Sequence, residues 1–271
     1  LHQPIANHTT GIRHVLDALT NTEHGVISSL DEVKAVGHRV AHGGEFFKSS
    51  VIVDEEAKKN IKSRVGAMLA TFDGEKIVLE EKHRFSNDPV SINGDLHWDV
   101  LRLFFEIKQG ILKCANSGDR DIDCIGIDTW GVDFGLIDKY GQLLENPIHY
   151  RDLRTKGMIE EADKSIPLRE LYNMTGIQFM ELNTLFQLIS LKKNRPWMLE
   201  RADKMLFMPD LFAYLLTGEK RAEATISSTS NFLNPTTKKF NTELLERLGI
   251  PTGILPEIIQ PGEAYGNLSD E

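Results

Sequence analysis

The sequence is poor in cysteine and lacks the motifs of the common nucleotide-binding and hydrolytic folds. Cys114 and Cys124 are its only cysteines. They form neither a CxxC pair nor a metal-ligand pattern, so we interpret them as two free thiols and predict no metal site. A P-loop, a GxGxxG fingerprint, a nucleophile elbow and an HExxH helix are all missing from the sequence. If this protein handles ATP, it does so without a P-loop.

Long apolar runs and blocks of like charge are also missing. No run approaches the ~20 apolar residues of a membrane-spanning helix, and no signal peptide is visible, so we expect a cytoplasmic protein with no membrane partner. The net charge is -9 without clustering. That charge argues against a nucleic-acid partner, because a polyanion needs cationic surface. Hydrophobic residues make up 41% of the chain, enough to bury a core in one large domain or two ordinary ones.

What the sequence does contain is a run of short strand and helix patterns whose character changes near Ser63. Two strand-like runs, Val65–Phe72 and Lys76–Phe85, flank Asp73-Gly74, a pair that tolerates positive φ and indicates a hairpin. Ahead of this change, the first 62 residues contain a helical pattern, Ile12–Leu19, and then strand-like and charged segments.

Beyond the hairpin, helices and strands alternate. Leu96–Ala115 has the apolar stripe of an amphipathic helix, with Asp95 as its expected cap. Cys124–Thr129 and Val132–Ile137 are typical of short strands. We expect the hairpin and these two strands to share one sheet with the helix packed on it, in a mixed α/β fold. Further helices are predicted at Leu168–Met174, Thr184–Lys193, Asp210–Leu216 and Leu244–Leu248, with Gly176 and Gly218 ending the first and third.

One candidate site lies where the strand Cys124–Thr129 ends, because ligands of open α/β sheets bind beyond the carboxyl edge. Trp130 offers an apolar face for a sugar ring, and Gly131 lets the backbone approach a ligand closely. Asp128 and Asp133 would accept hydrogen bonds from hydroxyl groups. In the alternative interpretation Trp130 is a core residue and the two aspartates cap turns. The residues alone leave both interpretations open.

Three other segments carry polar groups that suggest chemistry. In Tyr150–Thr155 two arginines flank an aspartate, which indicates either an anion site or a solvated ion-pair cluster. Asn183 precedes a predicted helix and either caps it or reaches a ligand. Near the N-terminus, His38–Glu45 is dense in polar groups, and Arg39 has the geometry to clamp a carboxylate with two hydrogen bonds.

Several of these motifs, in this order, resemble the N-terminal, sugar-binding half of FGGY-family carbohydrate kinases, and among them the rhamnulokinases. The resemblance extends from about Arg64 to the end of the chain. The motifs that carry it are Asp128–Phe134, Tyr150–Thr155, Tyr172–Gln178, Asn183-Thr184, Met208–Asp210, Tyr214–Gly218, Leu248–Pro251 and Pro261-Gly262.

The resemblance implies an actin-like, ribonuclease-H-like α/β domain over residues 63–271, with a mixed sheet and flanking helices. It implies a kinase that transfers the γ-phosphate of ATP, with Mg²⁺, to L-rhamnulose in L-rhamnose catabolism. A small-molecule sugar would lie against Trp130 and Gly131, with Asn183 nearby. Neither the sequence nor the resemblance sets the oligomeric state.

Residues 1–62 resemble a different family. Val36–Glu45 followed by Ser49–Val51 is similar to a motif of acetate kinases, whose arginine contacts the acetate carboxylate, and that arginine would be Arg39 here. Both families belong to one actin-like superfamily. The sequence therefore predicts an acetate-kinase-like segment ahead of the FGGY-like domain, with a helix and strand unit that occurs twice.

The resemblance also predicts which parts of such a kinase this chain lacks. The first strand of the rhamnulokinases ends in an Asp-Gly-Ala-Ser-Ser-Gly-Arg-like loop facing the phosphates. The residues ahead of Ala67 in this sequence contain no such loop. The family's general-base aspartate and nucleotide-binding domain would follow Glu271. We therefore expect no catalytic residue within the chain and no meaningful activity from it alone. Two alternatives are an acetate-kinase-like acyl phosphate kinase and a non-catalytic, fused or truncated sugar-binding domain.

Overall fold

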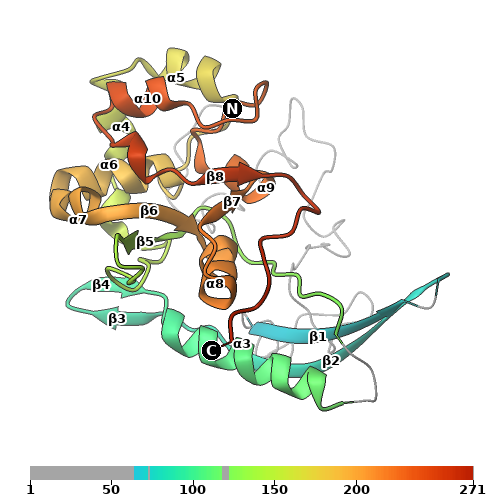
Figure 1. The fold of residues 1–271 in the computed structure, drawn as a ribbon. Helices are drawn as coiled ribbons and strands as arrows, with labels where there is room; N and C mark the ends of the chain where they lie inside the picture. Colours follow the sequence, from blue (N-terminus) through green and yellow to red (C-terminus); the bar gives the residue numbers. More distant parts are fainter. Residues whose placement is uncertain (1–63, 73, 118–121, 271) are drawn as a thin grey trace, which may run out of the picture. The chain divides into compact units, whose positions relative to one another are not determined.

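The computed structural model describes residues 64–72, 74–117 and 122–270, all of which belong to one compact unit, Ser63–Glu271 (Figure 1). The predictions made for residues 1–62, including the carboxylate clamp at Arg39 and the helix at Ile12–Leu19, lie outside the described residues.

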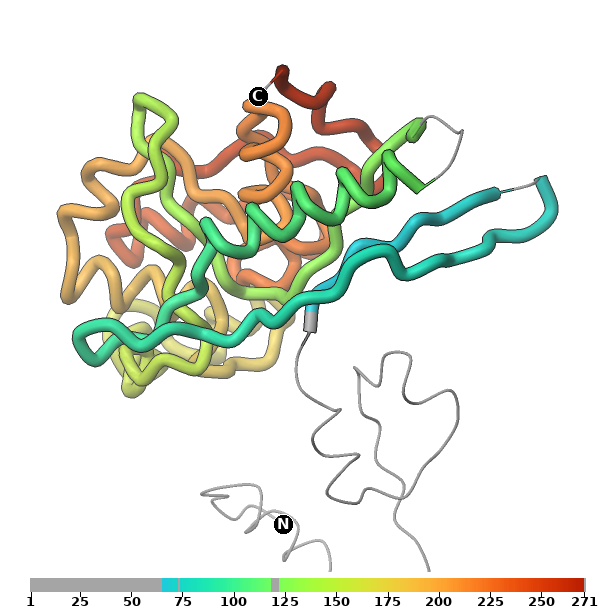
Figure 2. Tube along the Cα trace, turned by 90° about the horizontal axis from the view of Figure 1, so that it is seen from below, coloured from blue at the N-terminus to red at the C-terminus, as the bar shows by residue number. Residues whose placement is uncertain are grey.

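The predicted hairpin is present. Strands β1 (Arg64–Phe72) and β2 (Ile77–Ser86) pair antiparallel, and Gly74 has the positive φ of 98° that the turn requires. Helix α3 (Val100–Ala115) packs against this pair, and Figure 2 shows the hairpin running beside it. The approach is close at Gly110, where an added Cβ would lie 2.5 Å from the Cβ of Ala67. The hairpin and helix therefore form one packed unit.

Helix α3 begins later than its sequence pattern predicts. Asp99, and not Asp95, caps the helix by accepting a hydrogen bond from the backbone N–H of Arg102. Residues Asp95–His97 instead form β4, which pairs with β3 (Val90–Ile92). Residues of β4 do not join the helix, because their backbone N–H and C=O groups are already paired with β3.

A second region forms around an antiparallel pair, β5 (Phe134–Asp138) and β6 (Ala202–Phe207). Strand β6 had not been predicted. Helix α6 (Thr184–Asn194) lies in the core here, with every residue from 184 to 191 buried. Helix α8 (Met208–Thr217) follows β6 directly. A helix that is buried on all sides gives no one-sided apolar stripe, so its length and its caps are what reveal it in the sequence.

The remaining elements complete this second region (Figure 1). The helices predicted at 168–174, 184–193 and 210–216 are confirmed, and Gly176 and Gly218 end theirs in the left-handed conformation. Strands β7 and β8 pair in parallel. The other elements are η3 (Leu153–Thr155), α4 (Met158–Asp163), α5 (Leu168–Thr175), α7 (Pro196–Arg201), β7 (Arg221–Glu223), α9 (Ala224–Ser227), η4 (Ser228–Ser230), α10 (Thr242–Arg247), η5 (Thr252–Ile254) and β8 (Glu257–Ile259).

The prediction of one shared sheet is wrong for the described residues. The hairpin β1–β2 and the pair β5–β6 are separate two-stranded sheets. Residues 124–129, predicted as a strand of that sheet, have no ladder partner among the described residues and are not assigned to a strand. A strand needs a neighbouring strand that pairs with its N–H and C=O groups. The apolar residues Ile125 and Ile127 were therefore not enough to predict a strand here.

Within the described ranges, no helix combines the length and apolar character needed to span a bilayer.

Candidate functional site

The candidate site centres on the carboxylate of Asp133, which immediately precedes β5 and is fully buried. Its Oδ2 accepts hydrogen bonds from the indole N–H groups of Trp98 at 2.6 Å and Trp130 at 3.1 Å, and from the backbone N–H of Tyr150 at 3.1 Å. Its Oδ1 accepts from the side-chain amide of Gln187 at 3.0 Å. One interpretation of the sequence had Asp133 bind a hydroxyl ligand, and the other had it cap a turn. In the structure both of its oxygens are instead bonded to N–H groups of the protein. It joins four segments of the chain.

Burial and hydrogen bonding act on this carboxylate in opposite directions. The pKa of Asp133 is raised to about 6, because burial outweighs the four N–H donors, which lower it. All four groups are N–H donors and none can accept a hydrogen bond from a protonated carboxyl group. They therefore stabilise only the ionised form of Asp133. At neutral pH the group is a buried anion held by N–H donors.

Four aromatic side chains stack around this anion. The ring centroids of Trp98 and Trp130 are 4.0 Å apart, and those of Trp98 and His149 are 4.1 Å apart. Tyr150 continues the stack, with its centroid 4.5 Å from that of His149. Burial, together with the charge of Arg151, lowers the pKa of His149 to about 4. His149 is therefore a neutral ring at physiological pH, and Trp130, which is only partly buried, lies at one end of an aromatic cluster.

The backbone between Trp130 and Asp133 is strained at Val132, and both the N–H and the C=O group of that residue are hydrogen-bonded. Val132 has a φ of 68°, a left-handed conformation that β-branched residues rarely adopt. Its carbonyl accepts hydrogen bonds from Thr184 Oγ1 at 2.7 Å and Gln187 Nε2 at 3.2 Å, and its N–H donates to Thr229 Oγ1 at 3.0 Å. Strain that the surroundings enforce in this way is concentrated at ligand sites.

Gly131 precedes this strained residue in the chain, and Asn183 precedes Thr184, whose hydroxyl bonds the carbonyl of Val132. A Cβ at Gly131 would meet Thr229 Cγ2 at 3.0 Å, so the position has little room for any side chain. Asn183 occupies the N-cap position of α6 without capping it, because its Oδ1 accepts from the backbone N–H of Met180 at 2.8 Å. Trp130 and Gly131 therefore belong to the loop itself, and Asn183 belongs to the start of the helix that holds the loop.

The arginine pair of Tyr150–Thr155 divides between two roles. Arg151 is exposed and lies over the ring of Tyr150. Arg154 is largely buried, donates to Gln187 Oε1 at 2.5 Å, and burial lowers its pKa to about 10. Asp152 accepts hydrogen bonds from the backbone N–H groups of Leu96 and Arg154, both at 2.8 Å. Asp152 and Arg154 therefore hold neighbouring parts of the chain, whereas Arg151 stays exposed to solvent.

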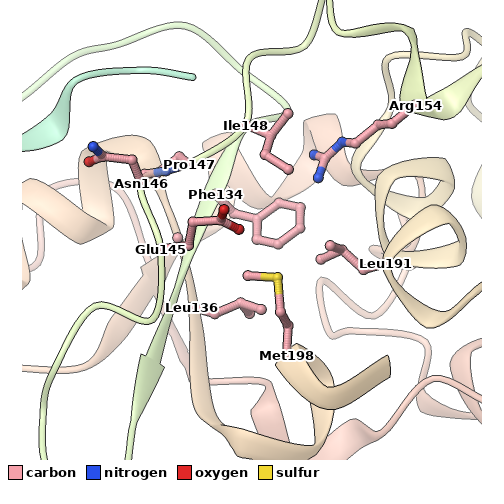
Figure 3. A pocket seen from close by; sticks show the side chains of 10 residues that line it. Phe134, Leu136, Glu145, Asn146, Pro147, Ile148, Arg154, Leu191 and Met198 are labelled. Carbon is pink, nitrogen blue, oxygen red and sulfur yellow. The ribbon is translucent and has the colours of Figure 1, made fainter. Parts of the chain in front are cut away.

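Two cavities border the site. The first is about 20 Å³, lies between Phe134, Glu145 and Arg154, and has room for about one water molecule (Figure 3). The second is about 70 Å³ and is lined by residues that include Asn87, Trp98 and Arg102. Both are too small to enclose a sugar, so a sugar bound by these residues would lie in part outside the cavities. No group of three or more metal-ligating side chains is found among the described residues.

Sequence reasoning missed four residues of this site, Trp98, His149, Gln187 and Thr229. Trp98 lies in the short segment between β4 and α3, and Gln187 lies inside α6, buried among apolar residues. A polar residue buried within an apolar helix, as Gln187 is, was the one available signal. Trp98 offered none, because only the fold brings it next to Trp130.

The fold and this loop define the class of protein. The sequence model for the FGGY family of carbohydrate kinases, N-terminal domain, matches residues 66–271, most of the chain. The chain therefore belongs to the FGGY family of carbohydrate kinases. The model for the acetokinase family matches residues 1–72, which agrees with the resemblance seen for the first 62 residues.

Curated relatives are rhamnulokinases. One from Halalkalibacterium halodurans is 40% identical over 212 residues, covering 78% of this chain and 45% of the relative. Another, from Bacteroides thetaiotaomicron, is 42% identical over 204 residues, covering 75% of this chain and 42% of the relative. The chain thus spans less than half the length of these relatives.

Solved structures of sugar kinases share the fold. The gluconate kinase of Lactobacillus acidophilus has a TM-score of 0.65 at 20% identity, with 72% of this chain and 41% of that chain covered. The glycerol kinase of Plasmodium falciparum with ADP has a TM-score of 0.62 at 18% identity, with 72% and 42% covered. The predicted actin-like α/β fold class is confirmed.

Proposed function

We propose that this chain carries the sugar-binding half of a kinase that phosphorylates L-rhamnulose with MgATP in the cytoplasm. The observation that carries the proposal is the roughly 40% identity to rhamnulokinases over a stretch that includes the whole loop around Asp133. Identity at this level, over the residues that shape a site, supports a shared substrate more strongly than the fold alone does.

The geometry suggests how such a loop would bind a sugar. Trp130 would supply an apolar ring face, since carbon-bound hydrogens of a sugar pack well on an aromatic ring. Gly131 would let the main chain come within hydrogen-bond distance of hydroxyl groups. Asn183 would lie nearby, with its carbonyl oxygen already occupied by Met180. A strained, fully hydrogen-bonded loop would hold these groups before the sugar arrives.

The described residues do not form a site for Mg²⁺. They contain no cluster of three or more metal-ligating side chains. We therefore derive no step through the metal or the nucleotide from them. In this family of reactions MgATP would supply the transferred phosphoryl group and neutralise its charge.

An ADP-release assay run in parallel with L-rhamnulose, acetate and buffer tests the proposal. Release with L-rhamnulose alone would support it. Calorimetry tests the case in which the chain binds the sugar but does not phosphorylate it. Heat of binding with L-rhamnulose and none with acetate would support a sugar-binding domain. Absence of both ADP release and heat with L-rhamnulose would contradict the proposal.

A second candidate function rests on the acetokinase match to residues 1–72. In this candidate the chain binds a small carboxylate, and Arg39 is the proposed clamp. ADP release with acetate and none with L-rhamnulose would favour it, and loss of that release in Arg39→Ala would assign the clamp.

A further inference from the structure

The two tryptophans next to the strained loop share one hydrogen-bond acceptor. Both indole N–H groups donate to Oδ2 of Asp133, from Trp98 at 2.6 Å and from Trp130 at 3.1 Å. An indole has one polar group, a single donor. With both donors committed to the same oxygen and the ring centroids 4.0 Å apart, neither ring can turn without disturbing the other.

The same carboxylate is fixed from its other side. Oδ1 accepts from Gln187 of α6, and Oδ2 also accepts from the backbone N–H of Tyr150. Gln187 in turn donates to the carbonyl of Val132. The side chain of Asp133 is fully buried, so it has no exposed surface with which to touch a ligand. Its effect on a ligand must pass through the groups that it holds.

We propose that Asp133 is a positioning residue that locks Trp98 and Trp130 into one unit and thereby presents the Trp130 ring beside Gly131 for a sugar. This inference rests on the proposed function and deepens it, since it gives a role to two residues, Asp133 and Trp98, that would not themselves contact the substrate. The energetic reason is preorganisation, because a ring already fixed in its binding orientation loses less freedom when the sugar stacks on it.

The substitution Asp133→Asn separates this role from simple space filling. Asparagine has nearly the same volume and keeps one acceptor, which can still face Gln187. In that orientation its NH₂ group points at the two indole N–H donors and cannot accept from them. Asp138→Asn is the matched control. Asp138 lies at the other end of β5 and accepts two turn N–H groups, from Tyr140 and Gln142, and asparagine can accept both equally well.

The indole N–H signals in a ¹H–¹⁵N NMR spectrum report on this unit without any ligand. The chain has three tryptophans, and the third, Trp197, lies on α7 with its side chain exposed, which makes it an internal reference. We expect Asp133→Asn to move the Trp98 and Trp130 signals upfield and leave Trp197 in place. Unmoved signals, or equal movement of all three, would overturn the proposal.

Trp98→Phe is a second variant, which keeps an aromatic ring at this position and removes one donor. It should move the Trp130 signal, because the shared carboxylate is then released from one of its partners. An unchanged Trp130 signal would show that the rings are not coupled, and this result does not depend on how well Asp133→Asn folds.

Calorimetry with L-rhamnulose then tests the consequence for binding. Asp133→Asn should bind roughly tenfold more weakly, the loss that follows from about one charge-assisted hydrogen bond, and Asp138→Asn should bind as the parent does. Equal affinity of Asp133→Asn and the parent would overturn the positioning role. If the parent itself does not bind L-rhamnulose, the proposed function fails, and the indole signals alone decide whether Asp133 locks the two rings.

Discussion

The hairpin region, made of β1, β2 and α3, and the central region, made of β5, β6, α6 and α8, bury their apolar side chains to very different extents. In the hairpin region Phe72 is 66% exposed and Leu79 is 61% exposed. In the central region Phe186, Phe207 and Leu211 are fully buried. Burial of apolar area is the main favourable contribution to folding. The stability of the described chain is therefore concentrated in the central region, and the strained loop is anchored there through α6.

The largest expected effect is a core truncation in the central region. Phe186→Ala removes a fully buried ring from α6 and should lower the free energy of unfolding by about 3–5 kcal/mol. Phe72→Ala, the matched change in the hairpin region, should lower it by less than about 0.5 kcal/mol, because that ring is mostly in solvent already. Urea titration of both variants measures the difference. Similar losses in the two variants would break the comparison.

A pH effect of similar size is expected from a second buried carboxylate of the central region. Burial raises the pKa of Asp210 to about 7 from 3.8, and its Oδ2 has no hydrogen-bond partner among the described residues. Between these two pH values the folded chain holds a proton that the unfolded chain has lost. The Asp210 contribution to stability is therefore complete below pH 3.8 and is lost as pH rises through about 7, a change of up to about 4 kcal/mol.

Asp210→Asn isolates this effect. The amide oxygen can still accept from the backbone N–H of Glu223 and from the hydroxyl of Tyr265, both of which bond Oδ1 in the parent. The free energy of unfolding of the parent, relative to that of the variant, should fall as the pH rises from 4 to 8. A difference that stays constant with pH would show that Asp210 is not a high-pKa group.

Trp130→Ala tests the sugar-binding loop. If the ring stacks on L-rhamnulose, the substitution should weaken binding by about 1–3 kcal/mol. Trp197→Ala, in an exposed tryptophan of α7, should leave the affinity unchanged. Calorimetry on both variants gives the answer, and equal affinities for Trp130→Ala and the parent would remove Trp130 from the site.

The smallest expected effect comes from the tight contact at Gly131. Gly131→Ala places a methyl group 3.0 Å from Thr229 Cγ2 and should lower the free energy of unfolding by about 1 kcal/mol through overpacking. Adding Thr229→Ser removes that methyl group, keeps the hydroxyl that accepts from Val132, and should restore part of the loss. Gly126→Ala is the control, since its Cβ would meet nothing within 4 Å. Equal thermal shifts for both alanine variants would contradict the close approach.

The sequence by itself determined the family, the fold class, the hairpin, and the helices that end at Gly176 and Gly218. Each of these depends on residues close together in the sequence: a motif, a glycine that tolerates positive φ, or a periodic run of apolar residues. The loop around Trp130 and Gly131 was likewise visible as a candidate site, because a short motif carries the resemblance to the FGGY family.

Only the tertiary structure decided how that loop is held. The partners of Asp133 come from Trp98, 35 residues before it, and Gln187, 54 residues after it. The pairing of β5 with β6 joins residues still farther apart in the sequence, such as Phe134 and Phe207, and the segment 124–129 has no strand partner among the described residues. A hydrogen bond needs two groups, and one residue's pattern in the sequence does not identify the distant partner that the fold brings to it.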